Sequence, residues 1–317
     1  MKIFLNLTFI AWSSIMLRGI SFAQPVIPND VPTEFSNQGG IINTRHNMMQ
    51  STMASGGGTI MNASRNNYNE VCVYCHTPHG AATNATVPLW NRTLPTGTTY
   101  QTYNQLNTSS LTGLVSQPGG ASLPCLSCHD GSQATDAILN MPGSGQYSTS
   151  PAPWNYVAGP GTTRSSQHLG LASGFNNVGT PSSTSCMSCH NPSFGSGNAG
   201  DPTDFTAFLI GTDLRNDHPV GINFPTTSGP GTDWKTPTGA VTRGGSTTSF
   251  FDEDSNGRMD KGDIRMYGNG PTDSRVECAS CHDPHGVPSA GTGSVFNATF
   301  LRKTNAGSVV CLTCHTK

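Results

Sequence analysis

The sequence predicts a chain of mostly irregular structure, with short α-helices and few strands, arranged around something other than a protein core. Its 317 residues include 37 Gly and 22 Pro, which favour turns and loops. Leu, Ile, Val and Phe together make up about 18% of the chain, below the roughly 20% under which chains tend towards disorder. Charged residues are only 11%, against about 25% in average proteins, so a highly charged disordered chain is excluded. Much of the buried apolar mass must come from another source.

The first 23 residues have the pattern of an export signal. Lys2 precedes an apolar stretch over residues 3–17, and the small residues of the segment 21–23 precede a predicted cleavage site before Gln24. Arg18 ends the apolar stretch and no later segment approaches 18 apolar residues, so we expect no membrane span. The predicted location is secreted and extracellular, with the periplasm as the alternative.

The ten cysteines all fall in five copies of one pattern, Cys-x-x-Cys-His. In an exported protein they would ordinarily predict five disulfides, but disulfides do not explain a His directly after every second Cys. A zinc ribbon uses its Cys-x-x-Cys pairs in twos and needs no such His, and thioredoxin-like chemistry needs a βαβ scaffold that this sequence lacks. The copies are CVYCH at 72–76, CLSCH at 125–129, CMSCH at 186–190, CASCH at 278–282 and CLTCH at 311–315.

Cys-x-x-Cys-His is the attachment signature of c-type haem. The two thiols bond to the edge of the porphyrin, and the His that follows reaches the iron. The sequence therefore predicts a pentahaem c-type cytochrome organised around a chain of five haem c groups, which supply apolar mass and cross-link the loops. The covalent ligands are Cys72, Cys75, Cys125, Cys128, Cys186, Cys189, Cys278, Cys281, Cys311 and Cys314, and the proximal iron ligands are His76, His129, His190, His282 and His315.

The second axial position of each iron decides between electron transfer and catalysis, because only an open position binds substrate. Five His lie outside the five patterns, one for each predicted haem, and we predict them as distal ligands: His46, His79, His168, His218 and His285. Irons closed by two His leave no catalytic residue, so an enzyme is not expected. The alternative that some of these His are ordinary surface or core residues stays open, above all for His168.

Two of the predicted distal ligands share a local motif. His79 and His285 lie in the strings CHTPHG and CHDPHG, three residues after a proximal His. A His so placed leaves on the same side of its own haem, so we expect it to bind the iron of a neighbouring haem and hold two irons close together. His218 precedes Pro219, which favours an extended backbone at the ligand. His46 lies in the segment TRHNMM near the start of the mature chain.

The patterns divide the chain into parts that include a repeat. The segment from CVYCHTPHG through PLWNRT to CLSCH is matched by the segment from CASCHDPHG through FLRKT to CLTCH, and each is a two-haem module. The predicted parts are a signal peptide at 1–23, an N-terminal arm at 24–69, a two-haem module at 70–130, a central region with a single haem at 131–250, a calcium-binding-like loop at 251–270 and a C-terminal two-haem module at 271–317. A short helix is expected over 204–211.

The acidic segment DEDSNGRMDKGD has the spacing of an EF-hand loop. Its oxygen donors are spaced as positions 1, 3, 5, 7, 9 and 12, with Gly257 at the sharp turn and Met259 at the usual apolar position. The predicted calcium ligands are Asp252, Asp254, Asn256, the backbone carbonyl of Arg258, Asp260 and Asp263. One structural Ca²⁺ is expected there, and a solvated acidic turn without a metal is the alternative.

These motifs resemble the doubled-CxxCH multihaem cytochromes that metal-reducing and related bacteria export. The resemblance rests on the two CxxCHxPHG strings, on NDHPVG, and on the acidic loop that leads into RVECASCHDPHG. Some members of this broad group are similar in composition to subunits of extracellular cytochrome filaments (nanowires), in which a His of one subunit can complete a haem in the next. The resemblance implies a homopolymeric filament for this chain, with His46 donated to the adjacent subunit.

Three functional classes follow. The first is electron conduction outside the cytoplasm, either as a filament subunit for extracellular electron transfer or as a monomeric carrier. The second is a multihaem oxidoreductase, which needs an open iron; the CxxCK site of the usual pentahaem nitrite reductases is absent, since every pattern ends in His. The third is a calcium-dependent structural protein, which does not explain one spare His per iron. The net charge of −2 disfavours nucleic acid, so the expected partners are other redox proteins or extracellular electron acceptors.

Overall fold

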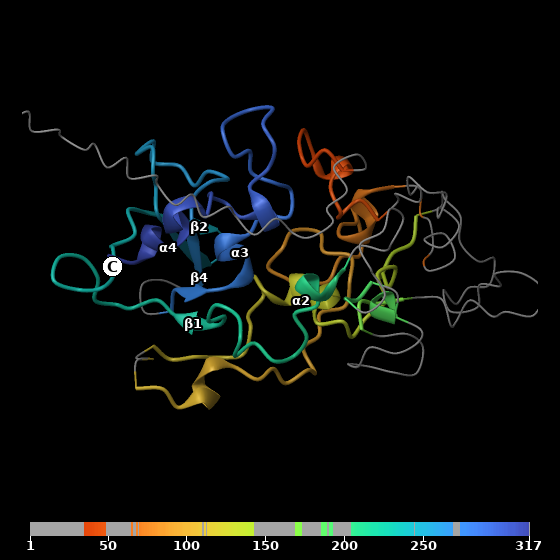
Figure 1. The fold of residues 1–317 in the computed structure, drawn as a ribbon, viewed down its shortest axis with the longest axis horizontal. Helices are drawn as coiled ribbons and strands as arrows, with labels where there is room; N and C mark the ends of the chain where they lie inside the picture. The colour runs from red at the N-terminus through yellow and green to blue at the C-terminus, as the bar shows by residue number, and fades with distance from the viewer. Residues whose placement is uncertain are drawn as a thin grey trace, which may run out of the picture.

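The computed structural model describes residues 35–48, 65, 68, 70–109, 111, 113–142, 169–172, 185–188, 190–192, 204–243, 245–268 and 273–316. Irregular backbone joins short helices and one small sheet in these residues (Figure 1). The predicted signal peptide at 1–23 lies outside the described residues, as do His168, Cys189 and most of the predicted N-terminal arm at 24–69. None of the helices in the described ranges is long and apolar enough to cross a membrane.

The helices of the described residues are one or two turns long, and each of their three α-helices carries a Cys-x-x-Cys-His pattern. The α-helices are α2 (Leu123–His129), α3 (Cys278–Cys281) and α4 (Val309–Cys314). A Pro occupies the first turn of α2, where its missing N–H removes no helical hydrogen bond. In α3 the Glu277 side chain and the backbone N–H of Ser280, and the Ser280 hydroxyl and the Glu277 N–H, form a capping box. The segment expected to be helical at 204–211 contains a single 3₁₀ turn, Thr206–Phe208.

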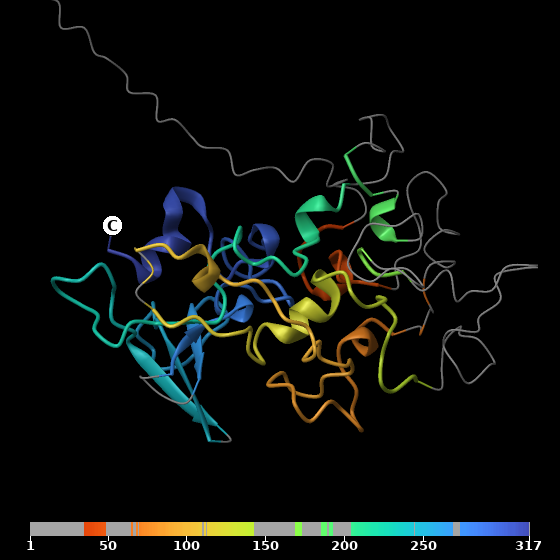
Figure 2. The ribbon, with the colours of Figure 1, turned by 90° about the horizontal axis from the view of Figure 1, so that it is seen from below.

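A five-stranded antiparallel sheet lies beside α3 and α4, and the sequence analysis did not locate it. The strands are β1 (Ile222–Asn223), β2 (Gly239–Arg243), β3 (Ser246–Phe250), β4 (Arg265–Gly268) and β5 (Arg275–Val276), in the order β1-β5-β4-β3-β2. The β2–β3 hairpin extends away from the helices (Figure 2). The predicted calcium loop connects β3 to β4, so both of its ends are fixed by neighbouring strands.

The apolar side chains form three small clusters rather than one core. The largest packs Phe224, Phe251, Ile264 and Met266 against Cys281 and Cys314, among others. A second packs Tyr68, Val73 and Tyr74 against Cys75, and the third packs Tyr100 and Leu214 against Leu126, which lies between Cys125 and Cys128. Three or four buried residues stabilise little by themselves, because burial contributes in proportion to apolar area. Each cluster lies at a Cys-x-x-Cys-His pattern, so a group attached there would enlarge it.

The glycine of the CHDPHG string tests how tightly this motif is packed. Gly286 has φ of +80°, and a Cβ added there would lie 2.2 Å from the ring of Phe296. Gly291 has φ of +94° with nothing near the same position, which makes it a matched control for backbone strain alone. We expect Gly286→Ala to lower the free energy of unfolding by more than about 2 kcal/mol and Gly291→Ala by about 1 kcal/mol. Denaturant unfolding of both variants measures the difference, and equal losses would show that Phe296 moves aside.

Candidate haem-binding sites

The Cys-x-x-Cys-His patterns lie in helical turns wherever the structure describes them. Such a turn puts residues i and i+3 on the same side, so the two thiols of a pattern and its imidazole form one unit. The His backbone N–H bonds the carbonyl oxygen of the first Cys, with N–O distances of 2.8 Å for His76 and Cys72, 2.9 Å for His190 and Cys186, 3.1 Å for His282 and Cys278, and 3.0 Å for His315 and Cys311. The nine cysteines within the described part of the chain are free thiols.

Three proximal His have Nδ1 held by a backbone carbonyl. The Nδ1–O distances are 2.9 Å from His76 to Pro88, 2.7 Å from His129 to Phe208 and 2.7 Å from His282 to Thr299. A carbonyl only accepts, so Nδ1 carries the proton and Nε2 keeps a free lone pair, which is the form of imidazole that binds a metal. Burial lowers the pKa of all three rings, which keeps them neutral at pH 7.

The segments that supply these carbonyls make equivalent contacts in the two modules. In the first, Thr77 N–H donates to the Leu89 carbonyl; in the second, Asp283 N–H donates to the Phe300 carbonyl, and both distances are 2.8 Å. Leu89 and Phe300 also share a left-handed backbone, with φ of 57° and 58°. The repeat found in the sequence thus extends to the path of the chain that anchors His76 and His282.

A buried cation contacts the second pattern of each module. Arg92 is fully buried, and its Nε donates to Ser127 Oγ of the CLSCH pattern over 3.1 Å. The equivalent residue, Lys303, donates from Nζ to Thr313 Oγ1 of the CLTCH pattern over 3.0 Å. Lys303 also pairs with Glu253 of the acidic loop. Sequence reasoning missed both cations, although the aligned strings WNRT and LRKT place them at matching positions.

Two distal candidates lie opposite proximal His. The ring centroids of His46 and His129 are 6.2 Å apart, and those of His76 and His285 are 6.0 Å apart. An imidazole nitrogen lies about 2 Å from the metal it binds, so two rings on opposite sides of one iron have centroids about 6 Å apart. The spacing of these four rings is therefore the spacing expected of two pairs of axial ligands.

His46 lies against residues of both modules. Its ring stacks on Phe300 at 4.5 Å between centroids, and its Nδ1 lies 3.4 Å from the Pro284 carbonyl oxygen. Burial lowers the pKa of His46 to about 4, with the nearby His129 contributing in the same direction. The ring is thus neutral at physiological pH and able to bind iron. Its position favours ligation within the chain, and donation to an adjacent subunit stays the alternative.

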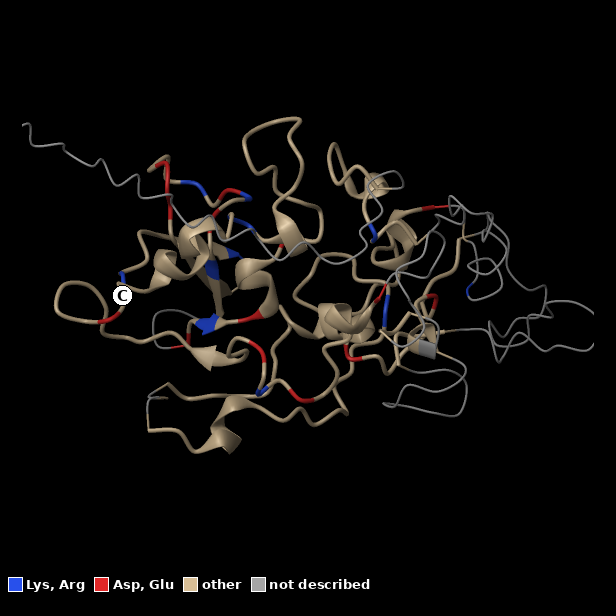
Figure 3. Cartoon of the chain, viewed as in Figure 1, with Lys and Arg blue, Asp and Glu red and all other residues tan. Residues whose placement is uncertain are grey.

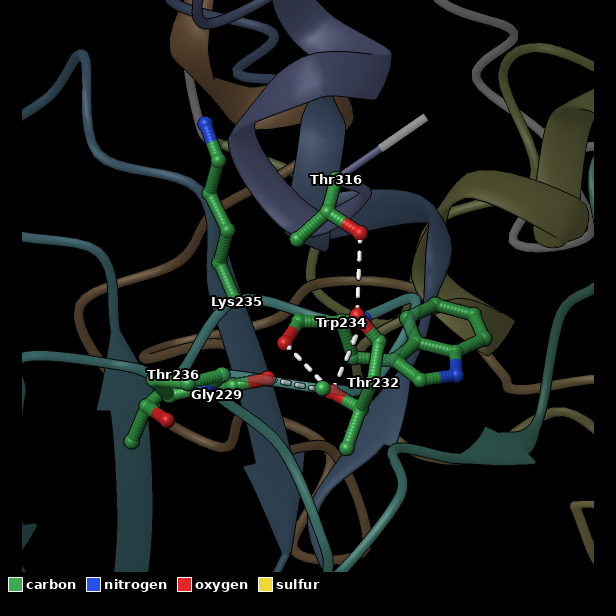
Figure 4. Close-up of a pocket in the computed structure, with 8 residues that line it drawn as sticks. Gly229, Thr232, Trp234, Lys235, Thr236 and Thr316 are labelled. Atoms are coloured by element: carbon green, nitrogen blue, oxygen red, sulfur yellow. Dashed lines mark hydrogen bonds between the residues drawn. The ribbon is translucent and has the colours of Figure 1, made fainter.

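The last pattern of the chain is held by a segment before β2. Lys235 N–H donates to the Cys314 carbonyl over 2.8 Å, and the Trp234 ring lies 4.3 Å from the ring of His315. Beside them is an open cavity of about 520 Å³, with Thr232, Trp234, Lys235 and Thr316 around it (Figure 4). Burial lowers the pKa of His218, and His315 is close enough to contribute. His218 also contributes to the lowered pKa of His282, so it lies near the proximal His of both patterns of the last module.

The third pattern is described only in part. The ring of His190 stacks on Phe205 at 3.8 Å, and Phe205 N–H donates to the His190 carbonyl over 2.9 Å. The ring of His79 makes no ring contact with a proximal His in the described residues, and its carbonyl accepts a hydrogen bond from Thr77 Oγ1. No ring contact within the described residues therefore pairs His79 with a proximal His, and the predicted ligand His168 lies outside them.

The Cys-x-x-Cys-His patterns of α2 and α3 lie side by side at their first cysteines. Cys278 N–H donates to Ser122 Oγ over 2.8 Å, and the nearby thiols of Cys125 and Cys278 raise the pKa of Cys125 and lower that of Cys278. Glu277, 3% exposed, accepts hydrogen bonds from the Gly119 N–H and from the Ser122 hydroxyl. Burial raises the pKa of this carboxyl. The predicted attachment points Cys125 and Cys278 are 153 residues apart in the sequence, and the buried contact between Ser122 and Glu277 lies beside both.

The acidic loop turns sharply at Gly257. Gly257, with φ of +74°, donates its N–H to Asp252 Oδ2 over 2.8 Å. The Asn256 amide donates to Asp254 Oδ2 and to Asp260 Oδ2, over 2.8 and 2.6 Å, which gathers the predicted donors. Charged residues are sparse elsewhere, and both signs gather on this loop (Figure 3). Within the described part of the chain, no group of three or more His, Cys, Asp or Glu side chains forms a metal site.

Comparison with known families identifies one segment. Residues 269–317 match the family described as the doubled CXXCH motif. That family indicates covalently bound haem c and an electron-transfer protein, a multihaem c-type cytochrome. No curated protein matches the chain.

Proposed function

We propose that this protein conducts electrons through five covalently bound haem c groups, each held by one Cys-x-x-Cys-His pattern and closed by two His. The observation that carries the proposal is the anchoring of proximal His76, His129 and His282 through Nδ1, which presents Nε2 of each ring to a metal. The free thiols beside these rings complete the covalent site. The residues present therefore fit the group that the doubled CXXCH match implies.

The protein residues have three tasks in this function. Bound haem c supplies reversible one-electron chemistry at its iron. The backbone carbonyls orient the proximal rings, burial keeps the imidazoles neutral, and the short helices place pairs of thiols on one side. The contact between Cys125 and Cys278 brings attachment points of the two modules together. Close spacing of attachment points is what a conductor needs, while a catalyst needs an open iron.

We further propose that the protein acts outside the cytoplasm, from the signal-like pattern of residues 1–23. Assembly into a filament stays a prediction from composition and resemblance, with the monomeric carrier as its alternative. Electron microscopy of the haem-loaded protein separates them, because only a polymer gives fibres of constant width.

A calcium ion in the acidic loop is the second part of the proposal. It is supported by the donor spacing from Asp252 to Asp263 and by the Asn256 contacts that gather the carboxylates. The ion would reduce the repulsion among carboxylates and fix the connection from β3 to β4. Its expected role is structural, and calcium titration followed by calorimetry tests it.

A reductive titration tests the electron-transfer function. The purified protein, titrated anaerobically with dithionite, is expected to take up five electrons per chain and to return them to an oxidant without loss of the low-spin visible spectrum. A high-spin fraction that binds nitrite or hydroxylamine would instead support the oxidoreductase alternative.

A further inference from the structure

The CHDPHG segment of the last module lies beside His residues of the N-terminal arm and the first module. Pro284 offers its carbonyl to Nδ1 of His46, whose ring lies opposite His129. The next residue, His285, lies with its ring opposite that of His76 at 6.0 Å, the two planes being 16° apart. Two adjacent residues of the last module thus lie beside rings that face the two proximal His of the first.

We propose that the haem carried by Cys72 and Cys75 is held between His76 and His285, so that its iron joins the first module to the last. The inference rests on the proposed haem-binding function and adds the identity of one ligand pair. It also gives the two CHxPHG strings different roles. The ring of His285 lies opposite a proximal His, whereas the described residues contain no ring contact between His79 and a proximal His.

Asp283 is the positioning residue of this site. Its Oδ1 lies 3.1 Å from Nδ1 of His285, and its Oδ2 lies 3.4 Å from Nη1 of the buried Arg302. The His rings anchored elsewhere by Nδ1 face neutral carbonyls, as His76 does with Pro88. A carboxylate partner makes the imidazole a stronger electron donor to the iron it binds, which favours the oxidised state.

The arrangement of the attachment points agrees with this pairing. Cys278 N–H donates to Ser122 Oγ over 2.8 Å, and Ala279 N–H donates to the Ala121 carbonyl over 3.3 Å. These bonds join the start of α3, in the last module, to the start of α2, in the first. The last module therefore lies directly beside the first, within reach of His285.

The test compares His285→Ala with His79→Ala, a matched change in the same motif. His285→Ala is expected to convert one haem in five from low to high spin, seen by electron paramagnetic resonance, and added imidazole should reverse the change. Made in a Cys72→Ser/Cys75→Ser background, which lacks the first haem, His285→Ala should add no high-spin signal. His79→Ala should leave the first haem low-spin. Any high-spin signal that His79→Ala adds should therefore also appear in the Cys72→Ser/Cys75→Ser background.

Each other result overturns the pairing. A low-spin spectrum for His285→Ala shows that His285 is not a ligand, and a high-spin signal that persists in the Cys72→Ser/Cys75→Ser background assigns it to another haem. Should His285→Ala fail to assemble, His285→Met keeps the iron six-coordinate and is expected to raise one midpoint potential, a shift that vanishes in the same background. A wild-type protein without bound haem would instead contradict the proposed function itself.

Potentiometry tests the role of Asp283. Asp283→Asn is expected to raise the midpoint potential of one haem, Asp283→Glu to restore it, and both to have no effect in the Cys72→Ser/Cys75→Ser background. Unchanged potentials in Asp283→Asn would overturn the positioning role and leave the ligand assignment standing.

Discussion

Replacing Arg92 by Ala is expected to lower the free energy of unfolding by at least about 3 kcal/mol. The side chain is fully buried, and besides Ser127 Oγ it donates to the carbonyl oxygens of Ser127, Ala134 and Thr135 over 2.8–3.0 Å. Removing it leaves several buried acceptors without donors, each costing roughly 1–3 kcal/mol. Since whole domains are stable by only about 5–15 kcal/mol, this variant should be close to unfolding. Denaturant titration of the holoprotein measures the loss.

Arg215→Ala is the control for Arg92→Ala. Arg215 pairs with Asp213 at 2.6 Å on the surface, where both side chains are well exposed. Such exposed pairs contribute little to stability, so no measurable change is expected. A loss in Arg92→Ala no larger than that in Arg215→Ala would show that the buried network does not stabilise the first module.

Replacing His46 by Ala is expected to open the haem carried by Cys125 and Cys128. His46 is the imidazole facing His129, so its removal should turn one fifth of the haem from low to high spin. The visible spectrum and electron paramagnetic resonance of the variant measure this fraction. His218→Ala is the matched comparison, since it should open a haem of the last module instead, and the double variant should show two fifths.

Dilution decides where the ligand of that haem comes from. A ligand within the chain keeps the wild-type spectrum low-spin at every protein concentration. A high-spin fraction that grows on dilution would contradict the intrachain position of His46 and restore the contact between subunits. An unchanged spectrum in His46→Ala would contradict a ligand role of either kind.

The sequence predicts the attachment chemistry of this protein better than it predicts the fold. The Cys-x-x-Cys-His patterns are local, so the spacing alone predicts the attachment chemistry that the doubled CXXCH match at 269–317 supports. The distal His were predicted by counting and by the CHxPHG repeat. Their partners could not be, because the contacts of His285 with His76 and of His46 with His129 join segments far apart in the chain.

The sheet and the buried polar groups lay beyond sequence reasoning for a different reason. β1 and β5 are two residues each, and β2 and β3 are rich in Thr, Ser and Gly, so no alternation of apolar and polar residues marks them. Glu277 and Asp283 read as ordinary surface charges beside a haem motif. Only the folded chain shows that Glu277 is buried against Ser122 and that Asp283 holds His285.

The number of haem groups per chain tests the central claim most directly. A pyridine haemochrome assay against the protein concentration, with electron paramagnetic resonance on the same sample, is expected to give five haem c per chain, all low-spin. A count below five, or cysteines of the purified protein that still react with a thiol-alkylating reagent, would contradict the account, because at least one Cys-x-x-Cys-His pattern would then carry no haem.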